Sequence, residues 1–285
     1  MRIMVTGATG QLGRDVLSAL RENQHACLGV SSADFDLQDA EAVYRAVEAY
    51  RPEAIIHCAA YTAVDLAESE PDRCMAVNGG GTLNLARAAL RVDARLMYIS
   101  TDYVFDGTGD APHEASDKLQ ACNVYGLSKI QGEEAVRGLM TKYFILRTSW
   151  VFGAGGGNFV RTMLRLGREK QRISVVCDQI GAPTYTVDLA RLIAAMIVTD
   201  RYGVYHATNE GCCSFAEFAA VILRSVGSRC HVVPIATAEY PCAARRPLNS
   251  RLSKRSLDEA GFSRLPIWED ALMRYLDELR AAGEV

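Results

Sequence analysis

The chain has 285 residues, of which 49% are hydrophobic and 23% are charged, and it carries a formal net charge of -3. This composition excludes a disordered chain, a collagen-like chain and a coiled coil, and the length indicates one large or two modest domains. The mildly acidic balance lacks the broad basic field that non-specific binding to nucleic acid or to an anionic membrane needs, although it allows a local anion site.

The first 150 residues alternate short apolar runs with longer segments of helical spacing. Strands are predicted over Arg2–Val5, His25–Val30, Ala54–Ala59, Arg95–Ser100 and Tyr143–Thr148. Helices are predicted after the segment GATGQLG and over Ala40–Tyr50, Arg73–Leu90 and Tyr125–Leu139. Repeated β-α-β units imply an α/β fold with a Rossmann-type, doubly wound parallel sheet. Ligands of such sheets lie outside the carboxyl ends of the strands.

The pattern after residue 150 is looser and indicates a smaller C-terminal α/β substrate lobe. Helices are predicted over Asn158–Glu169, Val187–Val198, Ser214–Val226, Lys254–Ala260 and Ile267–Ala282. Strands are predicted over Ile173–Val176, Val204–Ala207 and His231–Ile235. We therefore expect an NAD(P)-binding domain over residues 1–150 and a smaller substrate-binding domain over residues 151–285, with residues 185–210 returning to the first domain.

The cysteines and histidines give no sign of a metal site. The nine cysteines are scattered without a C-x-x-C pair, and the five histidines show no ligand spacing. No apolar run reaches the length of a transmembrane helix, and the N-terminal run is too short for a signal peptide. We expect a cytoplasmic protein with reduced thiols, no metal and no membrane partner.

A glycine triplet follows the first predicted strand. Gly7, Gly10 and Gly13 would let backbone N–H groups and a helix N-terminus approach a pyrophosphate. An ordinary βα turn is the alternative, but the position between a first strand and an amphipathic helix favours dinucleotide binding.

The end of the second strand bears on the choice of cofactor, because a carboxylate there holds a ribose 2′-hydroxyl and repels a 2′-phosphate. Here the strand runs into Ser31 and Ser32, and the acids Asp34 and Asp36 come later. Arg14, beside the glycine turn, faces either a phosphate or solvent. We expect NADPH, with NADH as the alternative.

Tyr125 and Lys129 stand four residues apart on a predicted helix and therefore on one face of it. A nearby ammonium favours the phenolate, so we expect Lys129 to lower the pKa of Tyr125 and prepare it for acid–base work. The same spacing also occurs on ordinary solvated helices, but here it follows a strand that ends in Ser100 and Thr101.

These motifs resemble those of known protein families. GATGQLG, STDYVF and YGLSK resemble the extended short-chain dehydrogenase/reductases. HCAAYTAVDLAE, STDYVFDG, NVYGLSK, RTSWVFG, NFVRTML, DQIGAPT and RPLNSRL more narrowly resemble the dTDP-4-dehydrorhamnose reductase family. The motifs run in order from residue 7 to about residue 252, and so cover nearly the whole chain.

The resemblance implies reduction of the 4-keto group of dTDP-4-dehydro-L-rhamnose, a nucleotide sugar, to dTDP-L-rhamnose. Tyr125 would protonate the developing alkoxide, Lys129 would hold the nicotinamide ribose and tune Tyr125, and Thr101 would hydrogen-bond the reacting oxygen. The remaining cofactor contacts would be Gly10, Gln11, Leu12, Asp36, Leu37, Ala59, Ala60 and Tyr61, together with Gly7, Gly13, Ser31 and Ser100. The substrate contacts would be Thr62, Asp102 and Trp150.

Two further segments are candidates for the substrate diphosphate. The segment Gly153–Asn158, including Asn158, either closes over that group or is simply a flexible loop. Arg245 and Arg246 are either phosphate contacts, with Arg246 counted in the site, or members of a surface charge pair.

Other functions remain open at this point. An epimerase, another nucleotide-sugar reductase or a 4,6-dehydratase would share Tyr125, Lys129 and Thr101, but the dehydratases of this group generally have Thr-Asp-Glu where this chain has Thr-Asp-Tyr. A non-catalytic NADP-binding subunit, like the regulatory subunit of methionine adenosyltransferase, is the alternative from another class. Either a monomer or a homodimer fits the sequence.

Overall fold

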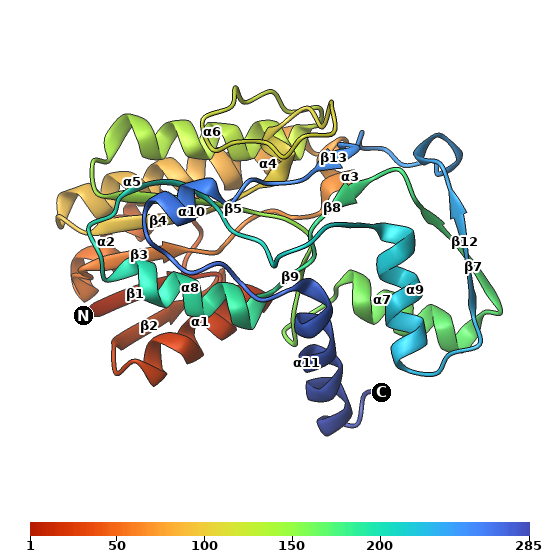
Figure 1. Ribbon diagram of the computed structural model, residues 1–285. Helices are drawn as coiled ribbons and strands as arrows, with labels where there is room; N and C mark the ends of the chain where they lie inside the picture. Colours follow the sequence, from red (N-terminus) through yellow and green to blue (C-terminus); the bar gives the residue numbers. More distant parts are fainter.

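Six parallel strands form the central sheet of the computed structural model, which describes residues 1–285 (Figure 1). In spatial order they are β2 (Ala26–Val30), β1 (Arg2–Thr6), β3 (Ala54–His57), β4 (Arg95–Thr101), β5 (Tyr143–Thr148) and β10 (Gly203–His206). The strand order reverses between β1 and β3, where open α/β sheets bind their ligands. The prediction of a Rossmann-type α/β fold is confirmed.

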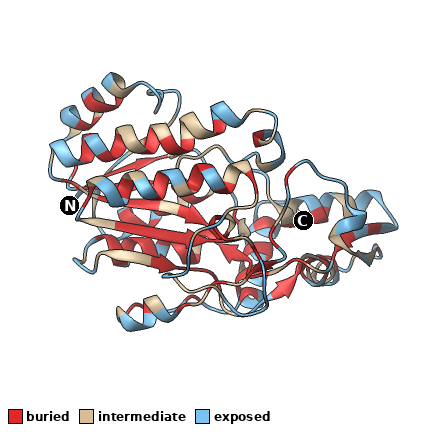
Figure 2. Ribbon diagram, turned by 90° about the horizontal axis from the view of Figure 1, so that it is seen from above, coloured by how far each residue is buried: buried red, intermediate tan, exposed pale blue.

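Helices cover both faces of this sheet (Figure 1). One face carries α2 (Ala40–Tyr50), α5 (Gly81–Arg91) and α6 (Val124–Leu139), and the other carries α1 (Gln11–Glu22) and α8 (Thr186–Ile197). Figure 2 shows that the strands are largely buried and that the helices expose only their outer sides. The sheet is therefore buried on both faces, which explains why runs such as that of β3 are almost wholly apolar.

The predicted helix over Arg73–Leu90 is three segments joined end to end. They are α4 (Pro71–Met75), a π-helical turn (Ala76–Gly80) and α5, and a short helix α3 (Val64–Ala67) precedes them. Gly79, Gly80 and Gly81 lie within this helix and do not break it. A Cβ on Gly79 would lie 2.1 Å from Oε1 of Gln131, so glycine there lets α6 pack closely against the turn.

The remaining elements build the smaller lobe. Its helices are α7 (Phe159–Glu169), α9 (Phe215–Ser225) and α11 (Trp268–Ala281), while α10 (Arg255–Glu259) packs on β10. Its strands are β7 (Arg172–Val176) paired with β12 (His231–Ile235), β6 (Val151–Phe152) paired with β9 (Thr184–Tyr185), and a three-stranded sheet of β11 (Cys213–Ser214), β8 (Ile180–Gly181) and β13 (Asn249–Ser250). Short 3₁₀ turns cover Asp102–Val104 and Thr237–Glu239. A separate apolar core, with Phe152, Phe218, Trp268 and Tyr275 among its members, holds this lobe together.

None of the helices has both the length and the apolar character that crossing a membrane requires.

Candidate active site

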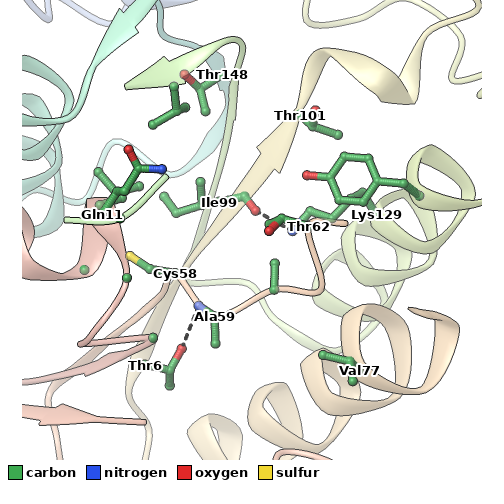
Figure 3. A pocket seen from close by; sticks show the side chains of 18 of the residues that line it. Thr6, Gln11, Cys58, Ala59, Thr62, Val77, Ile99, Thr101, Lys129 and Thr148 are labelled. Carbon is green, nitrogen blue, oxygen red and sulfur yellow. Dashed lines mark hydrogen bonds between the residues drawn. The ribbon is translucent and has the colours of Figure 1, made fainter. Parts of the chain in front are cut away.

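A cavity of about 1140 Å³ lies between the carboxyl ends of the central strands and the smaller lobe (Figure 3). The residues assigned to the site from the sequence line it except Tyr61 and Asn158, and the candidate phosphate contacts Arg14 and Arg245 do not line it. In Figure 3, Thr101 and Lys129 approach the cavity from one side and Gln11 from the other. The fold therefore brings the glycine turn, the segment after β3, the end of β4 and the start of α6 to one place.

The glycine turn is a tight cradle at the cavity rim. Gly7 has a φ of +68°, and a Cβ there would lie 2.7 Å from the backbone nitrogen of Ala59. A Cβ on Gly13 would lie 2.1 Å from the carbonyl oxygen of Gly7. Both positions exclude any larger side chain, and the N-terminus of α1 opens directly behind them with no side-chain cap. Unpaired N–H groups at such a terminus are suited to a pyrophosphate.

A chain of buried hydrogen bonds fixes the strand ends beside this turn. The Thr6 hydroxyl lies 2.7 Å from Nδ1 of His57 and accepts a bond of 3.3 Å from the backbone N–H of Ala59. Nε2 of His57 lies 3.1 Å from the Thr82 hydroxyl. Burial, together with the charge of Lys129, lowers the pKa of His57 to about 3, so the ring is neutral and its role is structural.

Tyr125 and Lys129 both line the cavity from the first turns of α6, which begins after the Asn123 cap. Lys129 is only 2% exposed; its Nζ donates a bond of 2.7 Å to the carbonyl oxygen of Ile99 and lies 4.1 Å from the centre of the Tyr98 ring. Burial lowers the pKa of Lys129 to about 7, and the nearby Glu133 carboxylate opposes that shift.

The expected lowering of the Tyr125 pKa is wrong. Burial raises the pKa of this phenol well above its usual value, and the charge of Asp102 adds to the effect, while a hydrogen bond from Thr101 opposes it. The expectation rested on the ammonium of Lys129 alone. It took no account of desolvation, which disfavours the phenolate.

Thr101 and Asp102 follow β4 directly. The Thr101 hydroxyl donates a bond of 3.0 Å to Oδ1 of Asp102 and accepts one of 3.3 Å from the backbone N–H of Tyr103. Oδ2 of Asp102 is buried and has no hydrogen-bond partner. Burial raises the pKa of Asp102 to about 6. A buried carboxylate with a free oxygen in the cavity wall is available to a polar ligand.

An ion pair behind β4 supports this wall. Glu133 and Arg147 are both fully buried, and the Arg147 guanidinium donates two bonds, of 2.8 and 2.7 Å, to the two carboxylate oxygens of Glu133. The Ser100 hydroxyl donates a further bond of 2.7 Å to the same carboxylate. Arg147 also reaches the carbonyl oxygen of Ala115 and Nε2 of His206. The network joins β4, β5, β10 and α6.

The opposite wall comes from the smaller lobe. Trp150 has a φ of +48°, and its indole stacks on the Phe215 ring with 3.6 Å between the ring centres. Arg246 forms a bidentate pair with Asp65, with bonds of 3.0 and 2.6 Å. Arg246 therefore lines the cavity and belongs to a charge pair, while its role as a phosphate contact stays a prediction.

Tyr61 and Asn158 stand outside the cavity lining for identifiable reasons. The Tyr61 hydroxyl turns away and donates to Glu70, with 3.0 Å between the oxygens. The Asn158 side chain caps α7 and donates to Oε1 of Gln11 at 3.1 Å, while the amide of Gln11 donates to the carbonyl oxygen of Gly157. Asn158 thus holds the glycine-rich loop against α1, and the loop itself lines the cavity.

The comparisons with known proteins agree with this geometry. A family model described as the RmlD substrate binding domain matches residues 1–281. The chain belongs to this family. It is 39% identical over 281 residues to the spore coat polysaccharide biosynthesis protein SpsK of Bacillus subtilis, with 99% of each chain covered.

Relatives named dTDP-4-dehydrorhamnose reductase are equally similar. The one from Aggregatibacter actinomycetemcomitans is 39% identical, covering 95% of this chain and 97% of its own. The crystal structure of the Bacillus anthracis reductase in complex with NADP has a TM-score of 0.95 and 43% identity, covering 97% of this chain and 99% of that one. The sequence and the structure therefore both resemble members of this family.

Several residues that shape the site were not found from the sequence. Asn78 lies in the π-helical turn and is 2% exposed; it accepts a bond of 2.8 Å from the Tyr61 backbone N–H and donates one of 3.0 Å to the Tyr61 carbonyl oxygen. Glu133, Arg147 and Phe215 were also missed. A charged residue inside the otherwise apolar strand YFILRT was the available signal for Arg147.

Proposed function

We propose that this chain reduces the 4-keto group of dTDP-4-dehydro-L-rhamnose with NADPH, giving dTDP-L-rhamnose for nucleotide-sugar biosynthesis. One observation carries the proposal: Thr101, Tyr125 and Lys129 line the same cavity as the glycine cradle, in a chain of the RmlD family. The bound NADP of the 43% identical Bacillus anthracis reductase supports the choice of cofactor.

The cradle fits the dinucleotide. The N–H groups at the N-terminus of α1 meet its pyrophosphate beside Gly10, Gln11 and Leu12, with Gly7 and Gly13 leaving room for the approach. The other proposed cofactor contacts are the lining residues Ser31, Asp36, Leu37, Ala59, Ala60 and Ser100. Tyr61 contributes only through its backbone, which Asn78 holds. When bound, NADPH supplies the hydride.

Tyr125 is the proton donor. A phenol whose pKa is raised by burial stays protonated at neutral pH, so it has a proton to give to the sugar oxygen as negative charge develops there. Thr101 donates a second hydrogen bond to that oxygen once its hydroxyl proton turns from Asp102 to the sugar, which places a donor where charge appears. Lys129, held against Ile99, binds the nicotinamide ribose and favours the charge left on Tyr125 after proton transfer.

The lobe side of the cavity recognises the nucleotide sugar. We assign the sugar to Thr62, Asp102 and Trp150 and the diphosphate to Arg246, whose planar guanidinium suits phosphate oxygens. Asn158 acts indirectly, by holding the glycine-rich loop closed over α1. Residues 1–150 with α8 and β10 then form the cofactor domain, and the rest of the chain forms the substrate domain. The protein works in the cytoplasm, as a monomer or a homodimer.

The test is a direct assay. Purified protein, dTDP-4-dehydro-6-deoxy-L-mannose and NADPH should consume reduced cofactor and yield dTDP-L-rhamnose, measured by absorbance and by chromatography of the product. Tyr125→Phe should lower kcat/KM about 10²- to 10⁴-fold and leave cofactor affinity unchanged.

The alternatives give different results in this assay. Near-normal turnover by Tyr125→Phe would remove this residue from the acid role. Cofactor binding without consumption of a verified substrate would favour the non-catalytic subunit, and turnover of a different nucleotide sugar would favour a related reductase or epimerase.

A further inference from the structure

The side chain of Asn123 joins the helix that carries Tyr125 to the segment that carries Arg246. Its Oδ1 accepts a bond of 2.8 Å from the backbone N–H of Gly126 and so caps the N-terminus of α6. Its Nδ2 donates a bond of 2.8 Å to the carbonyl oxygen of Arg245. The residue is only 5% exposed, and only one orientation of its amide satisfies both partners, since one is a donor and the other an acceptor.

A second contact holds the same segment to α3. Oδ1 of Asp65 accepts a bond of 3.1 Å from the backbone N–H of Ala244, and the same carboxylate accepts two bonds from the guanidinium of Arg246. The Nε–H of Arg246 makes no hydrogen bond within the chain and stays free for an anion. The backbone just before Arg246 is therefore fixed at two successive residues, once by Asp65 and once by Asn123.

The first turn of α6 is also held at two points. The backbone N–H of Val124 donates a bond of 2.9 Å to Oε1 of Glu68, while Asn123 holds the N–H of Gly126. Tyr125 comes between these two anchors in the chain and lines the cavity. Asn123 does not line the cavity, so its effect on the reaction has to pass through residues that do.

We propose that Asn123 is a positioning residue that fixes Arg246 relative to Tyr125, so that a nucleotide sugar whose diphosphate binds the guanidinium presents its keto oxygen to the phenol. One sugar ring separates the diphosphate from the keto group, so the two contacts have to keep a set spacing. Loss of the link to Arg245 lets the segment move, which weakens diphosphate binding and leaves the proton donor in place. The inference rests on the proposed function for the identity of the substrate.

Asn123→Ser is the decisive variant, because a serine hydroxyl still caps α6 but is too short to reach the carbonyl oxygen of Arg245 as well. We expect the dissociation constant of dTDP, measured by calorimetry, and the KM for the nucleotide sugar to rise about threefold to tenfold, the effect of one hydrogen bond. The kcat should stay within about twofold and the urea midpoint of unfolding should not change. Unchanged dTDP affinity, or equal losses in kcat and dTDP affinity with a lower urea midpoint, would overturn the inference.

Asn123→Ala removes the cap together with the link. It should also lower the urea midpoint and reduce kcat about threefold to tenfold, because the first turn then frays around Tyr125. Asp39→Ala is the matched control: Asp39 caps α2 by accepting a bond of 3.1 Å from the backbone N–H of Ala42, and it lies outside the cavity lining. This control should lower the urea midpoint and leave kcat and dTDP affinity unchanged. A comparable loss of dTDP affinity in Asp39→Ala would overturn the inference.

The route through Arg246 is tested by combining variants. Arg246→Gln alone should weaken dTDP binding about tenfold, because a charged donor to the diphosphate is lost. In that background, Asn123→Ser should change the dissociation constant by less than about twofold, because there is no longer a guanidinium to position. If the two effects multiplied in full, Asn123 would not act through Arg246 and the inference would be wrong.

The same measurements separate this inference from the proposed function. Reduction of the sugar by the parent chain, with unaltered dTDP affinity in Asn123→Ser, refutes only the role of Asn123. Absence of dTDP binding by the parent chain refutes the proposed substrate and this inference together. Binding of dTDP with the expected change in Asn123→Ser, but no reduction of the sugar, supports the role of Asn123 and refutes the proposed reaction.

Discussion

The two walls of the cavity hold their functional groups in different ways. On the sheet wall (Ser100 and Lys129, with the supporting pair Glu133 and Arg147 behind them), every side chain is buried and each of these polar groups has a partner on a neighbouring element. On the lobe wall (Trp150, Phe215 and Arg246), none of the three is fully buried.

The contacts of the lobe wall also span longer stretches of chain. Arg246 pairs with Asp65, which lies 181 residues earlier, and Trp150, between β5 and β6, stacks on Phe215 at the start of α9. The sheet wall is therefore a rigid support for proton transfer, while the lobe wall is assembled from remote segments that recognise a ligand. Preorganisation matters most where charge develops, which explains the asymmetry.

Removal of the Glu133 charge should destabilise the sheet wall. Glu133→Gln leaves the buried guanidinium of Arg147 without its counter-charge, at an expected cost of about 3–5 kcal/mol in the free energy of unfolding, measured in urea. It should also lower the pKa of Lys129 below about 7, since the Glu133 carboxylate raises that pKa. A smaller fraction of Lys129 is then charged at a given pH, so the alkaline limb of the plot of kcat/KM against pH should move to lower pH.

A second variant separates the two effects of Glu133. Glu133→Gln combined with Arg147→Met removes both buried charges and should recover part of the lost stability, because no unpaired ion remains. The displaced alkaline limb should persist, since the carboxylate near Lys129 is still missing. If the double variant restored the parent pH profile, the link between Glu133 and Lys129 would be wrong.

Asp102, which lines the cavity beside Thr101, should show the opposite sign of effect on stability. Folding raises its pKa from 3.8 to about 6, so the folded chain holds this proton more tightly than the unfolded chain does. Its contribution to stability is complete below pH 4 and is lost as the pH rises through 6. Asp102→Asn should therefore raise the free energy of unfolding by about 1–3 kcal/mol at pH 8 and by less than half of that near pH 4.5.

The same variant should bind the nucleotide sugar more weakly, so stability and affinity would move in opposite directions. Asp178→Asn provides the comparison. Burial raises the pKa of Asp178, but the hydrogen bonds from Thr237 to its carboxylate lower that pKa below its usual value. Loss of the Asp178 charge should therefore cost stability at pH 8. Equal changes in the two variants at pH 8 would show that charge removal in general, and not the site of Asp102, determines the result.

The contrast between the walls also explains how much could be predicted from the sequence. The central sheet, the glycine turn and the Tyr125–Lys129 pair were found because each signal is local: apolar periodicity, a βα turn and a spacing of four on a helix. The two-residue strands β6, β8, β9, β11 and β13 were missed because a period of two cannot be read from two residues.

The buried charges and the remote contacts could not be predicted for different reasons. Glu133 and Arg147 contradict the rule that charged residues lie outside, and only their mutual pairing makes their burial tolerable. The stacking of Trp150 on Phe215 and the raised pKa of Tyr125 depend on which segments the tertiary fold brings together. Local patterns along one chain carry no information about such contacts.

A single methyl group placed behind Trp150 should displace its indole ring in the lobe wall. A Cβ on Gly181 would lie 2.8 Å from Cε2 of the indole, while Phe215 closes the other side, so Gly181→Ala must shift the ring. We expect the KM for the nucleotide sugar to rise about tenfold, with kcat and the dissociation constant of NADPH little changed. In a Trp268→Phe background, the fluorescence of Trp150 reports the shift directly.

Gly138→Ala is the control for this last variant, because a Cβ there meets nothing within 4 Å and the residue lies near the end of α6. It should leave the KM and the Trp150 emission unchanged. An equal loss of kcat and of cofactor affinity in Gly181→Ala would contradict the division between the walls, since it would mean that the indole's support also holds Tyr125 and the glycine turn. A change confined to the KM would show that the small sheet of β8, β11 and β13 orients the sugar independently of the proton donor.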